Sequence, residues 1–267
     1  MNTKKVLFAI LLIALAGVII WKYAAPKQLV APVDIVTDTS PEASSIAGAV
    51  KNSAGDFEYK KENDYVIITA TFPAKVAVSD MAETKIRASV EQMIDETVER
   101  FERNINEMLS PDEQARLKED GRKYAMGIDY KMYTSPGYVS YSFLIYEDTG
   151  GAHPNSYNKT LVFDLNGNIV LLADLFKDGS RYLDRLSAAS YKIVLAELEK
   201  RMGVKIDDTQ IDTVRMGTAP TPENLQFFYL DNGNIVLMFP PYQVAAYAAG
   251  AFEARIPLSS LSDIFKK

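Results

Sequence analysis

The residues that could carry chemistry are few, and the best candidates lie in one short segment. His153 is the single histidine of the chain, and there is no cysteine. Disulfides, thiolate nucleophiles and cysteine metal sites are therefore excluded, as is any metal site within one chain that needs two or three imidazoles. His153 lies in the segment Gly150-Gly151-Ala152-His153-Pro154-Asn155, directly after Glu147-Asp148 and Thr149.

This segment is expected to form a loop that holds an imidazole in a defined place. The two glycines allow backbone angles that are closed to other residues, and Pro154 favours an extended conformation at His153. In one interpretation His153 is a general base, oriented by Glu147 or Asp148. In the other, which we favour, it is a structural histidine that bonds to backbone groups, since the chain has no nucleophile-elbow, phosphate-loop or dinucleotide-binding motif.

Charge narrows the class of partner. The chain has 267 residues, with 29 basic and 35 acidic side chains. It shows no basic stripe, so we expect no nucleic-acid partner. The first 27 residues contain four lysines and no acid, which leaves 25 basic against 35 acidic residues beyond them, a net charge of −10. Such a surface favours a cationic partner, although the same charge also serves solubility.

The N-terminus predicts export. Two lysines precede an uncharged run over residues 6–21, and a third follows it. The run fits a signal peptide or a signal anchor. Cleavage after Ala25 would place Tyr23 where a small residue is needed, so we expect an uncleaved single-pass transmembrane helix over residues 1–25. The positive-inside rule then places the rest of the chain outside the cell membrane, in the periplasm or extracellular space.

The rest of the chain predicts an α+β fold with antiparallel sheets, one long helix in the N-terminal half and one in the C-terminal half. Scattered prolines indicate a flexible linker over residues 26–55. An N-terminal α+β domain is expected over 56–150 and a C-terminal α+β domain over 151–265. Strand-like runs with turn residues between them account for most of both domains.

Local signals set the helix ends and two turns. Asp80 and Glu83 have capping-box spacing before apolar residues that recur every three or four positions, and a second helix is expected between Ser180 and Gly203. A shorter helix is expected to start at Ser110 and to end at Gly121. The six residues Asn-Gly-Asn-Ile-Val-Leu occur twice, at 166–171 and 232–237, and each copy is expected to form a type I′ hairpin turn.

Two segments together carry a family resemblance. One is residues 146–155, and the other is residues 239–250, which read Phe-Pro-Pro-Tyr-Gln-Val-Ala-Ala-Tyr-Ala-Ala-Gly. They resemble a bacterial extracytoplasmic module of paired domains of unknown function. Similar modules form the lysozyme-binding ectodomain of RsiV-type anti-sigma factors and the non-catalytic N-terminal region of PdaC-type peptidoglycan deacetylases.

The resemblance implies a membrane-anchored, non-catalytic binding or sensing module of the cell envelope, without a cofactor or metal. Its ligand would be a lysozyme-like cationic protein or a cell-wall glycan such as peptidoglycan. The alternative is a hydrolase-like cell-wall enzyme centred on His153. We expect neither the sigma-binding region of the anti-sigma factors nor the metal-dependent catalytic domain of the deacetylases. The expected binding residues are Gly150, Gly151, His153, Pro154, Asn155, Tyr242 and Tyr247.

Overall fold

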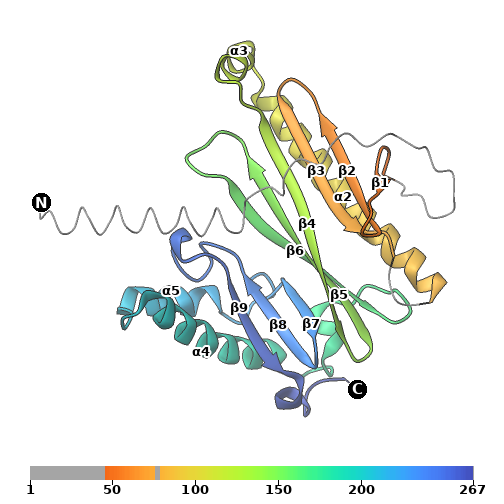
Figure 1. The fold of residues 1–267 in the computed structure, drawn as a ribbon. Coiled ribbons are helices and arrows are strands. Elements are labelled where there is room, and N and C mark those ends of the chain that lie inside the picture. Colours follow the sequence, from red (N-terminus) through yellow and green to blue (C-terminus); the bar gives the residue numbers. More distant parts are fainter. Residues whose placement is uncertain (1–45, 76–78, 267) are drawn as a thin grey trace, which may run out of the picture. The chain divides into compact units, whose positions relative to one another are not determined.

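The computed structural model of the protein describes residues 46–75 and 79–266, in which strands and helices are both abundant (Figure 1). The strands are β1 (Val50–Lys51), β2 (Asp56–Glu62), β3 (Val66–Pro73), β4 (Tyr124–Ser135), β5 (Tyr138–Asp148), β6 (Asn155–Asp164), β7 (Phe228–Asp231), β8 (Asn234–Phe239) and β9 (Phe252–Pro257). The α-helices are α2 (Asp80–Met108), α3 (Pro111–Asp120), α4 (Tyr182–Met202) and α5 (Asp208–Gly217). Three 3₁₀ helices are η1 (Leu172–Leu175), η2 (Tyr247–Ala249) and η3 (Leu258–Leu261).

The expected transmembrane helix over residues 1–25 lies outside the described residues. Within the described part of the chain, no helix is both long enough and apolar enough to cross a membrane. The expected linker also lies mostly outside. Its last ten residues, 46–55, are folded, because Ile46 is buried and β1 pairs with β2.

Six strands form the first sheet in the order β1-β2-β3-β4-β5-β6. All neighbours are antiparallel except β3 and β4, which are parallel. Between these two strands the chain passes through α2 and α3, and a helical crossover of this kind returns a strand in the same direction. The α+β class is confirmed, and the expectation of purely antiparallel sheets is wrong at this one pair.

Helix α2 covers one face of this sheet and closes the first core (Figure 1). Its apolar stripe is fully buried at Ile86, Val90 and Ile94, as the sequence period predicts. The helix cap differs from the expectation by one residue. Ser79 is the N-cap, because its Oγ accepts the N–H of Ala82 at 3.4 Å, and Asp80 lies in the first turn.

The second sheet has three antiparallel strands in the order β7-β8-β9, and α4 packs against β9. Leu186, Val194 and Leu198 of α4 are buried in this second core. Helix α4 ends at Gly203 as expected, but its N-cap is Arg181 rather than Ser180. Helix α5 was not expected, although Asp207 and Gln210 form a capping box at its start.

Strand β7 lies against the face of the first sheet that α2 leaves free. The N–H of Leu230 donates to Ser140 Oγ at 3.0 Å, and the N–H of Phe228 donates to Thr160 Oγ1 at 3.2 Å. Next to β7, the N–H of Gly233 donates to Ser135 Oγ at 3.0 Å. All described residues belong to one compact unit, and β6 completes the first sheet. The division into domains at 56–150 and 151–265 stays a prediction.

The two Asn-Gly segments adopt different turns. Asn232 and Gly233 have φ angles of 47° and 75°, and they join β7 to β8 in the expected type of hairpin. At the other copy only Gly167 has a positive φ, and Asp164 Oδ1 accepts the N–H groups of Asn166 and Asn168. The expected second strand there is wrong, because Ile169 makes only an isolated bridge to Phe163 before η1.

The two turn glycines should differ in how much stability they contribute. A Cβ at Gly167 would lie 2.6 Å from the carbonyl oxygen of Ala82, whereas a Cβ at Gly233 would meet nothing within 4 Å. We expect Gly233→Ala to cost about 1 kcal/mol for its positive φ alone. Gly167→Ala should cost about 3 kcal/mol, since the start of α2 must also move. Urea denaturation of the two variants measures the difference, and equal losses would contradict this packing.

Candidate functional site

The two segments singled out in the sequence meet in the structure. The loop between β5 and β6 carries His153, and the connection between β8 and β9 carries Tyr242 and Tyr247. The rings of His153 and Tyr247 stack, with centroids 4.2 Å apart and planes 17° apart. The ring of Tyr242 follows at 5.3 Å from that of Tyr247. We call these three residues the aromatic ladder.

The backbone carbonyl of Pro154 ties the ladder together. Tyr247 donates its hydroxyl hydrogen to Pro154 O at 3.1 Å, and His153 Nδ1 lies 3.1 Å from the same oxygen. A hydrogen bond at this contact requires the imidazole proton on Nδ1, since a carbonyl only accepts. The interpretation of His153 as a residue that bonds to backbone groups therefore agrees with the geometry.

The carboxylates expected to orient His153 bond to other groups. Glu147 accepts the hydroxyl of Tyr157 at 2.7 Å and pairs with Arg100 at 3.5 Å. Asp148 Oδ1 accepts the N–H of Gly150 at 2.9 Å. Within the described residues no carboxylate bonds to the imidazole, so the arrangement of a general base with its orienting acid is not formed.

The remaining expected site residues shape the loop. Gly150 has a φ of 77°, which only glycine adopts without strain. Gly151 is exposed, and Asn155 begins β6 opposite Glu147. The structure thus brings His153, Pro154, Tyr242 and Tyr247 into contact and uses the glycines for the path of the chain.

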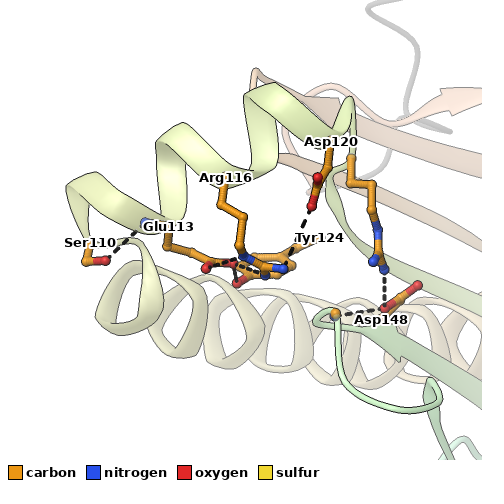
Figure 2. A network of polar contacts seen from close by, with 8 residues as sticks. Ser110, Glu113, Arg116, Asp120, Tyr124 and Asp148 are labelled. Carbon is orange, nitrogen blue, oxygen red and sulfur yellow. Dashed lines mark hydrogen bonds and ion pairs between the residues drawn. The ribbon is translucent and has the colours of Figure 1, made fainter.

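A polar network from α3 supports this loop (Figure 2). Glu113 accepts two hydrogen bonds from Arg116, at 2.9 and 2.6 Å, and a third from the hydroxyl of Tyr124. A Cβ at Gly150 would lie 3.6 Å from both Arg116 Nη2 and Tyr124 Cε1. In a separate contact just beyond α3, Arg122 pairs with Asp148 at 4.0 Å. Helix α3 therefore forms one wall of the loop.

The N-cap of α3 was predicted from the sequence, but the contact of this helix with the loop was not. Ser110 Oγ accepts the N–H of Glu113 at 3.2 Å, as expected of an N-cap. This bond fixes the first turn of α3, from which Glu113 and Arg116 reach Tyr124. The capping signal was readable in the sequence, whereas the contact with the loop depends on the return of β4 beside β3.

The charge of Glu113 should make the protein sensitive to acid. Hydrogen bonds from Arg116 and then Tyr124 lower the pKa of Glu113 from 4.5 to about 2. A lowered pKa stabilises the fold above the unfolded pKa, and this contribution is lost as the pH falls from about 4.5 towards 2. Glu113→Gln should flatten stability against pH over that interval, as followed by denaturation. Glu119→Gln, the same change on the exposed side of α3, is the control; an identical profile for both would contradict the assignment.

Tyr242 is held in a backbone conformation that large side chains avoid. Its φ is 73°, and its side chain is 64% exposed, so no burial offsets the strain. The neighbouring Gln243 fixes the chain, because its Nε2 donates to the carbonyls of Gly217 and Asn224, both at 2.8 Å. Strain of this kind concentrates at functional sites. The sequence shows the tyrosine but not its conformation.

Arg201 of α4 fixes the other end of the connection between β8 and β9. Its Nη1 donates to the carbonyls of Ala249 and Ala251, both at 2.8 Å, and its guanidinium carbon lies 3.9 Å from the ring centroid of Phe252. These contacts fix η2, which carries Tyr247. The ladder thus stands on two anchored segments.

Replacing Tyr242 should stabilise the protein. Asparagine tolerates the left-handed region, so Tyr242→Asn should raise the free energy of unfolding by about 1 kcal/mol. Tyr247→Phe, in the neighbouring ring of the ladder, is the comparison variant, for which the opposite change is expected. It removes one hydrogen bond to Pro154 and should lower that free energy by about 1 kcal/mol. Denaturant unfolding measures the change in the free energy of unfolding for both variants. A loss of stability in Tyr242→Asn would contradict the backbone strain at Tyr242.

The described residues contain no group of three or more His, Asp or Glu side chains placed to bind a metal ion together. The candidate site presents aromatic rings and a backbone carbonyl. Its chemistry is stacking and hydrogen bonding.

Comparisons with known proteins divide the chain in two. Residues 59–156 match the family described as deacetylase PdaC, and residues 173–259 match a family described as protein of unknown function (DUF3298). Peptidoglycan-N-acetylmuramic acid deacetylase PdaC of Bacillus subtilis (strain 168) is 30% identical over 179 residues. The alignment covers 66% of this chain and 37% of that enzyme, so the chain spans little more than a third of its relative.

Two solved structures share the fold. A DUF3298 family protein of Bacteroides fragilis has a TM-score of 0.57 at 18% identity, and one of Pseudomonas aeruginosa has a TM-score of 0.54 at 17% identity. Each comparison covers 79% of this chain and 92% of the other. The ladder takes His153 from the first matched region and both tyrosines from the second. The chain is a PdaC-like module in which a PdaC-type region is followed by a DUF3298 domain.

Proposed function

We propose that this chain is a non-catalytic, extracytoplasmic recognition module of the cell envelope, anchored by residues 1–25, and that the aromatic ladder is its binding surface. The observation that carries the proposal is an exposed tyrosine held at strained φ beside two stacked rings. The named relative acts on peptidoglycan, which supports a ligand in the cell wall. If residues 1–25 anchor the chain, protein extracted from membranes should still contain them.

A cell-wall glycan is the ligand that fits the ladder best. A sugar ring has an apolar face of C–H groups and a polar rim, and aromatic side chains with a polar tip match both. Tyr242 and Tyr247 present two rings in sequence, tilted by 34° to one another. Their connection is anchored by Gln243 and Arg201, so little conformational entropy is lost on binding.

A lysozyme-like cationic protein is the second candidate, favoured by charge. The net charge of −10 beyond residue 27 would attract such a partner over a distance and raise its association rate. That attraction weakens as salt is added, because ions screen it. Stacking on a neutral sugar depends little on salt, so the two ligands are separable.

The binding test compares soluble peptidoglycan fragments with a lysozyme, using the full chain. We expect saturable binding of one of them, weakened about tenfold or more by Tyr242→Asn. Leu171→Asn is the matched control, since Leu171 is 63% exposed and lies outside the ladder. Calorimetry at two salt concentrations distinguishes a glycan from a cationic protein.

Three outcomes would overturn parts of the proposal. A folded protein that binds neither ligand would refute the recognition role. Equal weakening by Tyr242→Asn and Leu171→Asn would remove the ladder from the binding surface. Turnover of wall fragments that disappears in His153→Ala would replace the binding module with the hydrolase-like alternative.

A further inference from the structure

Lys159 of β6 is a half-buried cation with a single hydrogen bond. Its Nζ donates to Thr97 Oγ1 at 2.9 Å, and within the described residues it forms no ion pair. An ammonium group has three hydrogens to donate, so two are left over. Burial is costly for a charged group that lacks a counterion. Burial and then the charge of Arg100 lower the pKa of Lys159, while Glu96 and Glu147 oppose this from a distance.

Arg100 of α2 places a second cation near Lys159, because it lies one helical turn after Thr97, the residue to which Lys159 donates. It stacks on Tyr157, with its guanidinium carbon 5.4 Å from the ring centroid, and bonds to the hydroxyl of that residue. Its ion pair with Glu147 is long, at 3.5 Å, and its side chain is 41% exposed. A guanidinium has five N–H donors in a planar fork, so donors remain for a ligand.

A catalytic use of this cluster does not fit the geometry. A lysine beside a threonine hydroxyl can act as the base for a nucleophile. Thr97, however, is fully buried, and its Oγ1 donates to the carbonyl of Met93 at 2.7 Å. No substrate can reach that oxygen, so the cluster is suited to binding and not to bond cleavage.

We propose that Lys159 and Arg100 form a second binding site, for a carboxylate or phosphate group, on the side of the first sheet that faces α2. An oxyanion between the two cations would accept their spare N–H groups and reduce the repulsion between them. The site shares no residue with the aromatic ladder, so its existence is independent of the proposed function. Terminal carboxylates of peptides and phosphates of anionic polymers both carry this chemistry.

The experiment titrates the full chain, carrying isotope-labelled lysine, with sodium acetate or sodium phosphate at constant ionic strength. We expect a saturable shift of the Lys159 signal in the NMR spectrum and a rise in the pKa of Lys159, since a bound anion favours the ammonium form. A response to acetate alone identifies a carboxylate site, and one to phosphate alone a phosphate site. A response to both supports the shared chemistry.

Matched variants decide whether the effect belongs to this site. Lys61→Gln is the control, because Lys61 also lies on the α2 side but pairs with Glu102 at 2.5 Å. Calorimetry should show that Lys159→Gln abolishes binding, that Lys61→Gln preserves it, and that Lys159→Arg, which keeps the charge, retains part of it. Absence of saturation with either salt, or unchanged binding in Lys159→Gln, would overturn the site.

Discussion

The structure depends on which groups accept hydrogen bonds from the backbone N–H groups along the edge of β7. An edge strand presents backbone N–H groups that need acceptors once they are buried. Here the hydroxyls of Ser140 and Thr160 supply them, and Ser135 does the same for the adjoining turn. Because these side chains are short, the two sheets approach closely. The connection that carries Tyr242 and Tyr247 therefore reaches the loop of His153.

The sequence was informative where a single element carries its own signal. The apolar period of α2 and the cap at Ser110 both predicted what is observed. Identical residues at 166–171 and 232–237 were not sufficient, because Asp164 captures the backbone of the first copy, whereas the second is paired as a hairpin. The parallel pairing of β3 with β4 was also missed, since strand direction depends on the crossover through α2 and α3.

The candidate site, too, was predicted from the sequence only in part. Its residues were chosen because two distant segments resemble one family, and the structure brings four of them into contact. The positive φ of Tyr242 and the support from Glu113 and Arg116 could not be read in advance, because both arise from contacts between elements far apart in the sequence. A surface whose rings come from both matched regions requires the two regions to be folded together.

The two Asn-Gly turns also bear on the chemical lifetime of the protein. Asparagine before glycine is prone to deamidation, in which the backbone nitrogen of the glycine attacks the side-chain amide. In this fold the N–H of Gly167 donates to Asp164 O and that of Gly233 donates to Ser135 Oγ, both at 3.0 Å. The attack requires these hydrogen bonds to open. The rate of deamidation at Asn232 would therefore report how often the two sheets separate.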